Sequence, residues 1–192
     1  VLKMKVNKIF YIILGLFIAT GGLMADSNNE NIITMVITQN EKVTDPVEVS
    51  PVQTVIIELF PDIAPNHVEQ IKTLVNEGFY DGIVFHRVIE GFMAQTGDPT
   101  GTGTGGSDLP DIRAEFTQTS FERGTLGMAR SGHPDSANSQ FFICFQEASF
   151  LNNQYTVFGR VIEGMEFIDA LVKGEPPEFP DKIISMNLSS NK

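Results

Sequence analysis

The chain breaks into many short strand-like segments with two segments of helical period among them, and this pattern limits the folds open to it. The strand-like segments are rich in β-branched and aromatic residues and are separated by turn formers such as glycine, proline, asparagine and aspartate. We predict strands over 34–39, 52–60, 83–88, 91–97, 112–116, 125–130, 140–145, 155–162 and 182–188. Because these strands do not alternate with helices, the pattern favours an antiparallel sheet over a parallel one.

Two segments carry the spacing of a helix. In residues 65–78, the apolar side chains of Val68, Ile71 and Val75 recur at helical intervals, and the same spacing recurs in residues 163–174. Eight or nine short strands with two helices predict a mainly β fold, an antiparallel barrel whose ends are covered by the helices.

We do not expect the N-terminal segment to be part of this fold. Three lysines precede residues 9–19, an apolar run with one glycine, and small residues follow before the sequence turns polar at Asp26. This is the pattern of a signal peptide cleaved near residues 21–25, so we expect residues 1–25 to be removed on export. The alternative is an uncleaved anchor at residues 9–25, at the short limit of what spans a bilayer.

The rest of the chain is strongly acidic. Loss of three lysines with residues 1–25 leaves 10 basic and 24 acidic residues, which changes the formal charge from −11 to −14. Such a surface repels phosphates and anionic headgroups, so nucleic acid is not an expected partner. Contact with a membrane is expected only if the N-terminal segment stays uncleaved. Residues 26–51 read as an acidic lead-in with a first strand and a loop, and residues 52–190 as the main domain.

Several features that suggest chemistry are interpreted as structural. Cys144, the single cysteine, lies in an apolar segment and is expected to be a packed, inert thiol. The glycine-rich run at 101–106 lacks the lysine of a phosphate-binding loop, and we interpret it as a tight surface loop. The three histidines are scattered, so no metal or other cofactor is expected.

Strand 140–145 has large apolar side chains on both faces. Strict alternation places Phe141 on one face and Gln140 and Phe142 on the other. Since one face of a barrel strand packs in the core, the second face is either covered by another element or lines a pocket.

Arg87 is a lone cation in an apolar, strand-like stretch. Such a residue ordinarily faces solvent; the alternative is a fixed cation beside an apolar pocket. Alternation places Phe85 and Arg87 on one face of their strand and Met93 and Gln95 on one face of theirs. With Gln140 and Phe142 of strand 140–145 added, the set holds one arginine, two glutamines and several apolar side chains, and no pair of nucleophile and base. It suits a site that holds a peptide and favours a conformational step.

Three motifs occur in a fixed order: FHRVIEGFMAQTGD at 85–98, GTLGMARSGHPDSANSQFFICF at 124–145 and FLNNQYTVFGRVIEGME at 150–166. Through them the chain resembles the cyclophilins, a family of peptidyl-prolyl cis–trans isomerases, over about residues 52–188. The resemblance implies a closed eight-stranded antiparallel β-barrel capped by two α-helices, in line with the architecture predicted above.

The resemblance also implies which residues form the site. Three are expected to be catalytic: Arg87, Gln95 and Phe142. Eight are expected to line the substrate site: Phe92, Met93, Ala129, Arg130, Gln140, Phe150, Leu151 and Tyr155. Regular pleating would turn Phe92 away from Met93, so its place in the site requires a bend after Gly91.

The activity implied is isomerisation of X–Pro bonds (EC 5.2.1.8) in unfolded or flexible proline-containing polypeptides, which assists protein folding. It needs no covalent intermediate, metal or cofactor, and a monomer is expected. Together with the N-terminal segment, this predicts an exported enzyme, periplasmic if the source is a Gram-negative bacterium.

Two other functions are open. A chaperone of the holdase type would grip proline-containing segments without turnover, and an interaction protein is compatible with the acidic exterior. Retention of Arg87 favours the enzyme, because a binder has no special need for that cation. Phe150 stands where many cyclophilins have tryptophan, and it lacks the indole N–H donor, so weak binding of cyclosporin is expected.

Overall fold

The structure is a computed structural model that describes residues 29–38 and 52–189. The expected signal peptide or anchor, residues 1–25, and residues 39–51 of the lead-in lie outside the described residues. In the described ranges, no helix is long and apolar enough to cross a membrane.

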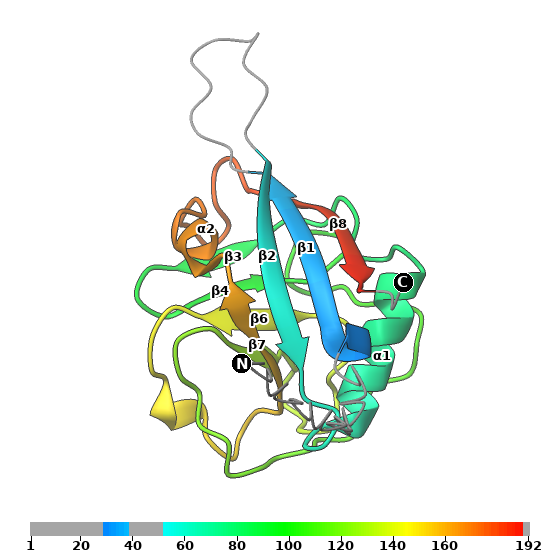
Figure 1. Cartoon of the computed structure of the whole chain (residues 1–192). Coiled ribbons are helices and arrows are strands. Elements are labelled where there is room, and N and C mark those ends of the chain that lie inside the picture. Colours follow the sequence, from blue (N-terminus) through cyan, green and yellow to red (C-terminus); the bar gives the residue numbers. More distant parts are fainter. Residues whose placement is uncertain (1–28, 39–51, 190–192) are drawn as a thin grey trace, which may run out of the picture.

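The described residues form one sheet of eight strands with two α-helices (Figure 1). The strands are β1 (Ile32–Thr38), β2 (Val52–Leu59), β3 (Arg87–Ile89), β4 (Met93–Thr96), β5 (Thr125–Met128), β6 (Phe141–Cys144), β7 (Val157–Glu163) and β8 (Ile183–Leu188). The helices are α1 (Pro65–Asn76) and α2 (Met165–Asp169), with short 3-10 turns η1 (Asn29–Asn31) and η2 (Ser149–Leu151). All strand pairs are antiparallel, in the order β3-β4-β6-β5-β7-β2-β1-β8.

The sheet curls strongly, so that its two ends approach each other. Isolated bridges join Val84 to Lys182 and Val88 to Gly174, across the gap between the β3 and β8 edges. The predicted mainly β fold, with eight antiparallel strands and two helices, is confirmed. The barrel is not closed by a continuous ladder of hydrogen bonds, as was expected of a closed barrel, because only isolated bridges join its two edges.

The segment 112–116, predicted to be a strand, is not one: a single bridge pairs Ile112 with Ala137. The backbone N–H groups that follow bind side chains: Ala114 N donates to the Asp135 carboxylate, and Glu115 N donates to the Thr156 hydroxyl. Backbone groups satisfied by side chains have no need of a strand partner.

The second helix is shorter than the 163–174 segment predicted for it, because α2 ends at Asp169. The following backbone is held by side chains instead. Val172 N donates to the Asp181 carboxylate, and Lys173 Nζ donates to the carbonyl oxygens of Asp169 and Leu171.

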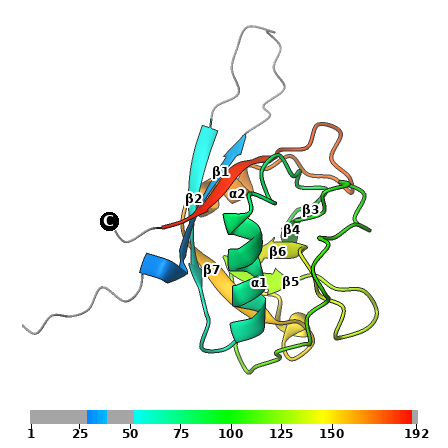
Figure 2. The ribbon, with the colours of Figure 1, turned by 90° about the vertical axis from the view of Figure 1, so that its right-hand side faces the viewer.

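The first strand belongs to the same sheet. β1 lies between β2 and β8, so the sheet includes a strand that precedes residue 52, the first residue expected in the main domain. Its side chains alternate, and Ile33, Met35 and Ile37 are fully buried. These residues join the interior cluster that α1 covers on one side of the curled sheet (Figure 2).

The start of α1 is fixed by a carboxylate from a distant loop. Glu115 accepts hydrogen bonds from the backbone N–H groups of Asn66 and His67 and from both of their side chains. The His67 ring is fully buried, and its Nδ1 lies 2.6 Å from Glu115. Burial lowers the pKa of His67 although Glu115 opposes this, while the hydrogen bonds outweigh burial and lower the pKa of Glu115.

We expect this pair to make the fold less stable in acid. The pKa of His67 is lowered in the folded state, so the unfolded chain takes up the proton more readily as pH falls below the ordinary value of 6.5. Glu115 acts in the same direction below its ordinary value of 4.5. The urea midpoint should therefore fall between pH 7.5 and pH 5, and His67→Gln should flatten this slope. The exposed His133 provides the control: an equal flattening in His133→Gln would contradict the assignment.

Candidate active site

The register of the sheet places three of the expected site residues in one row. Arg87 on β3 lies opposite Gln95 on β4, and Gln95 lies opposite Phe142 on β6. Phe142 in turn lies opposite Gly127 on β5. Directly opposed residues point to the same face of a sheet, so Arg87, Gln95 and Phe142 share one surface.

That surface is the second face of β6. Phe141 and Ile143 pack in the interior cluster, whereas Phe142 and Cys144 pack in a separate cluster on the opposite face. The alternation predicted for this strand is confirmed. Phe121 and other side chains cover the second face, and Phe92, Ala129 and Tyr155 are partly exposed at its margin. The surface between Arg87 and Phe142 is called the groove below.

Phe142 forms the centre of the apolar wall. Its ring stacks on Phe121, with centroids 5.7 Å apart, and meets Tyr155 edge-on at 5.8 Å. Gly127 leaves the space for this ring, because a Cβ there would lie 2.4 Å from Phe142 Cζ. Met93 and Leu151 pack in the same cluster and are buried, while Ala129 and Tyr155 are partly exposed at its edge.

Phe92 reaches the site through a bend. Gly91 has a φ of +69°, which favours glycine, and Phe92 N donates to the Ile89 carbonyl oxygen in the turn before β4. Phe92 therefore packs on the same cluster as Met93. Its ring centroid lies 5.4 Å from that of Phe150, which is 63% exposed and forms the outer rim.

The prediction that Phe85 shares a face with Arg87 is wrong. Phe85 is fully buried in the interior cluster, as is Val88, whereas Arg87 faces the groove. Alternation fails because β3 begins at Arg87, and Phe85 N donates instead to the Asp181 carbonyl oxygen at 2.9 Å.

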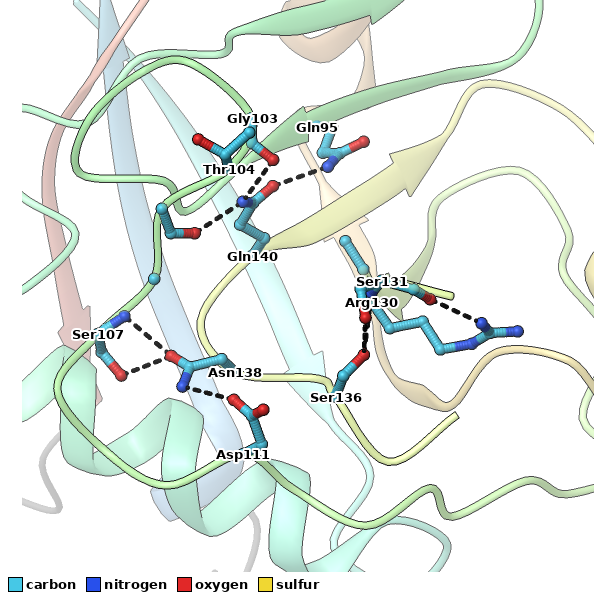
Figure 3. Close-up of a pocket in the computed structure, with 13 residues that line it drawn as sticks. Gln95, Gly103, Thr104, Ser107, Asp111, Arg130, Ser131, Ser136, Asn138 and Gln140 are labelled. Atoms are coloured by element: carbon cyan, nitrogen blue, oxygen red, sulfur yellow. Dashed lines mark hydrogen bonds between the residues drawn. The ribbon is translucent and has the colours of Figure 1, made fainter. Parts of the chain in front are cut away.

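A hydrogen-bonded chain of amides borders the groove. Gln95 Nε2 donates to Gln140 Oε1 at 2.8 Å, and Gln140 Nε2 donates to the carbonyl oxygens of Gly103 and Gly105 (Figure 3). The 101–106 run is a loop, as predicted, yet it also holds a predicted site residue in place.

Asp98 organises this loop, although it is not among the site residues predicted from the sequence. Its carboxylate accepts from the Thr100 hydroxyl and from the backbone N–H groups of Thr100, Gly103 and Gly105. Burial raises the pKa of Asp98, but these hydrogen bonds outweigh it and lower the pKa to about 2. An aspartate followed by alternating threonine and glycine is the available sequence signal for such a turn.

Arg130 and Tyr155 form the opposite border. The Arg130 guanidinium lies 4.6 Å above the Tyr155 ring and donates to the carbonyl oxygens of Gln154 and Ser131. Because all three donor nitrogens of Arg130 are bound to backbone carbonyl oxygens, Arg87 is the better placed of the two to act on a bound peptide.

Glu175 is a second residue that the sequence analysis missed. Its Oε2 accepts from Arg87 Nε at 2.7 Å, and both side chains are about half exposed. Within the described part of the chain, the Nη groups of Arg87 have no acceptor, so they remain available to a ligand. The two residues are 88 positions apart, and no local pattern links them.

Two other groups near the site do not present reactive chemistry. Cys144 is fully buried, and burial raises its pKa to about 12, as expected for an inert thiol. Burial also lowers the pKa of His86, which packs beside the 101–106 loop. The described residues hold no cluster of side chains fit for a metal ion.

The family model for cyclophilin type peptidyl-prolyl cis-trans isomerases matches residues 46–188. The chain belongs to the cyclophilin family. A probable peptidyl-prolyl cis-trans isomerase of Brucella suis is 52% identical over 153 residues, which cover 71% of this chain and 78% of the relative.

Solved cyclophilin structures are similar to this structure. A Cryptosporidium parvum cyclophilin is 28% identical with a TM-score of 0.72, covering 84% of this chain and 99% of that one. The same protein in the presence of the dipeptide Ala-Pro gives a TM-score of 0.68 at 28% identity, covering 82% and 99%. As a cyclophilin, this chain is a peptidyl-prolyl cis–trans isomerase, and the family binds proline-containing peptides.

Proposed function

We propose that this cyclophilin isomerises X–Pro bonds of exported polypeptides in the groove between Arg87 and the Phe142 wall. The observation that carries the proposal is the row of opposed residues Arg87, Gln95 and Phe142, which sets a cation with free donors beside an apolar wall. A related structure determined in the presence of Ala-Pro supports a proline-containing ligand.

The chemistry follows from the amide bond. Rotation about it has a barrier of ~18–20 kcal/mol, because the C–N bond has partial double-bond character. The two X–Pro isomers differ by only about 0.5–1 kcal/mol, so the reaction needs no energy source. A catalyst must therefore favour the twisted amide, in which resonance is lost and the prolyl nitrogen becomes a better acceptor.

Each side of the groove has a role in this account. The wall around Phe142, with Met93, Leu151 and Phe92, seats the proline ring and excludes water. The free Nη groups of Arg87 donate to the prolyl nitrogen or carbonyl of the twisted amide, and a low local dielectric strengthens that bond. Gln95, held by Gln140, orders the peptide backbone beside them.

We expect Glu175 to position Arg87. Its carboxylate holds Nε and leaves both Nη groups turned to the ligand, so Glu175→Ala should lower kcat with little change in KM. Exposed ion pairs contribute about 0–1 kcal/mol, which corresponds to a loss of up to about fivefold. Glu175→Gln, which keeps an acceptor, should recover part of kcat. A fall in kcat as large in Glu178→Ala, a nearby exposed acid, would contradict this role.

We expect cyclosporin to inhibit weakly. Phe150 supplies an apolar rim without the donor of a tryptophan, so Phe150→Trp should bind cyclosporin more tightly than the parent in a calorimetric titration. Phe116→Trp, at a partly exposed site outside the groove, is the control. Tight binding by the parent would show that the missing donor is unimportant.

The exported location rests on the N-terminal pattern of lysines, apolar run and small residues. Mass spectrometry of the protein recovered from cell fractions tests it. A periplasmic or secreted form lacking about 21–25 residues would support a cleaved signal peptide, an intact form in the membrane fraction would support the anchor, and an intact soluble form would reject both. Gel filtration of the same sample tests the expected monomer.

A further inference from the structure

A pocket lies where β2 ends and the chain turns into α1, a turn that can be followed in Figure 2. The pocket has a volume of about 500 Å³. Residues 58–63 form most of its lining, and Asn31 of η1 and Thr119 complete it. None of the residues predicted for the active site lines it, so this pocket is separate from the groove.

Half of the lining is apolar. Leu59 is buried, whereas Phe60, Pro61 and Ile63 are partly exposed. Phe60 and Ile63 pack against the apolar cluster that contains Phe142, and the Phe60 carbonyl oxygen accepts from two backbone N–H groups of the turn that follows it. These side chains are therefore held in place, and their exposed parts are left for a ligand. Pockets of about 300–1,000 Å³ with apolar walls and a few polar groups are typical ligand sites.

Two cations beside the pocket are already bound to residues of its lining. Arg160 Nε donates to Glu58 Oε2 at 3.0 Å, and the Arg160 guanidinium lies 5.9 Å from the centre of the Phe60 ring. Lys72 Nζ donates to Asn31 Oδ1 at 2.6 Å. Neither cation is part of the lining itself, whose two charged side chains are both carboxylates.

The remaining polar groups of the lining suit a peptide that carries a cation. Asp62 is exposed, and within the described ranges no cation pairs with it, unlike Glu58. The Thr117 hydroxyl donates to Thr119 Oγ1 at 3.0 Å, so the Thr119 hydroxyl keeps its own proton to donate. Since Asn31 is bound through Oδ1, its amide N–H groups can also donate. The pocket thus offers a carboxylate to a cation and two donors to backbone carbonyl oxygens.

We propose that this pocket is a second polypeptide-binding site, which takes an apolar side chain next to an arginine or lysine. The apolar side chain packs on Phe60 and Ile63, the cation pairs with Asp62, and Thr119 donates to a backbone carbonyl oxygen. The family binds peptides, so polypeptides are the ligands that reach this surface, and the formal charge of −11 attracts their basic segments. A glutamate in place of the cation would bring a like charge to Asp62.

The test is an NMR titration of the full chain with N-acetyl-phenylalanyl-arginine amide, a probe without proline. The backbone amides of Asp62, Ile63 and Thr119 should shift and saturate. The probe should bind about fivefold more tightly than its norleucine counterpart, the gain from one exposed ion pair, and the glutamate counterpart should bind most weakly. N-acetyl-glycyl-arginine amide should bind about tenfold more weakly than the phenylalanyl probe, because it buries no large apolar side chain.

Asp62→Asn should remove the preference for arginine over norleucine, whereas Asp108→Asn, an equal charge change at an exposed aspartate outside the lining, should keep it. Added salt should weaken the preference, because Asp62 is exposed. Equal affinity for the arginine and norleucine probes would overturn the proposal, as would an equal loss of preference in Asp108→Asn. Shifts centred on Gln95 and Phe142 would place the probe in the groove and would overturn it too.

Discussion

Arg87→Ala is expected to lose about two orders of magnitude in kcat/KM on an Ala-Pro peptide, the usual cost of removing one preorganised donor from a developing charge. The loss should fall mainly on kcat, because the apolar wall that seats the proline ring is untouched. Arg87→Lys should recover little, since a lysine cannot donate from Nη groups while a neighbouring nitrogen is held by Glu175.

The control for this variant is Arg113→Ala, which removes an exposed arginine outside the groove. It should leave both kcat and KM unchanged. If Arg87→Ala retained full activity with a folded domain, the row of opposed residues would not be the catalytic feature of the groove.

Gly127→Ala is expected to damage both the fold and the activity. The new methyl carbon would lie 2.4 Å from Phe142 Cζ and 2.6 Å from Phe121 Cε1, so the stacked pair must move. Overpacking of this kind costs about 1–3 kcal/mol in the free energy of unfolding. Because Phe142 is also the wall of the groove, kcat/KM should fall about tenfold, equivalent to ~1.4 kcal/mol of transition-state binding.

A second substitution separates the two effects. Adding Phe142→Leu to Gly127→Ala removes the clash with the Phe142 ring but leaves the one with Phe121, so urea unfolding should show only partial recovery of stability while activity stays low. Gly132→Ala is the matched control, because a Cβ at Gly132 meets no atom within 4 Å. If Gly127→Ala were as stable and as active as Gly132→Ala, the close packing of Phe142 would have no consequence for function.

The parts of the site that lie on regular strands could be predicted from the sequence. The alternation of β6 follows from residues two apart, so the separate faces of Phe141 and Phe142 could be read from the sequence and are present in the structure. The fold class likewise follows from the lack of helix–strand alternation.

What could not be predicted depends on contacts between distant or irregular segments. Glu175 reaches Arg87 from a loop 88 residues away, and Asp98 acts through a turn whose donors are mostly backbone N–H groups. The segment 112–116 has strand-like composition, but side chains from Asp135 and Thr156 take its backbone donors. Regular pleating predicts the wrong face for Phe85, because β3 begins only at Arg87.

The most direct test of the account is an exchange measurement by NMR on an Ala-Pro peptide with a catalytic amount of the full chain. Uncatalysed X–Pro isomerisation takes tens to hundreds of seconds, so exchange peaks between cis and trans forms at a mixing time of about a second require catalysis. The proposed function predicts these peaks, together with shifts of the Phe92, Gln95 and Phe142 amides on binding. Amide shifts in the groove without exchange peaks would contradict the proposed function. They would show a protein that binds proline-containing segments without isomerising them.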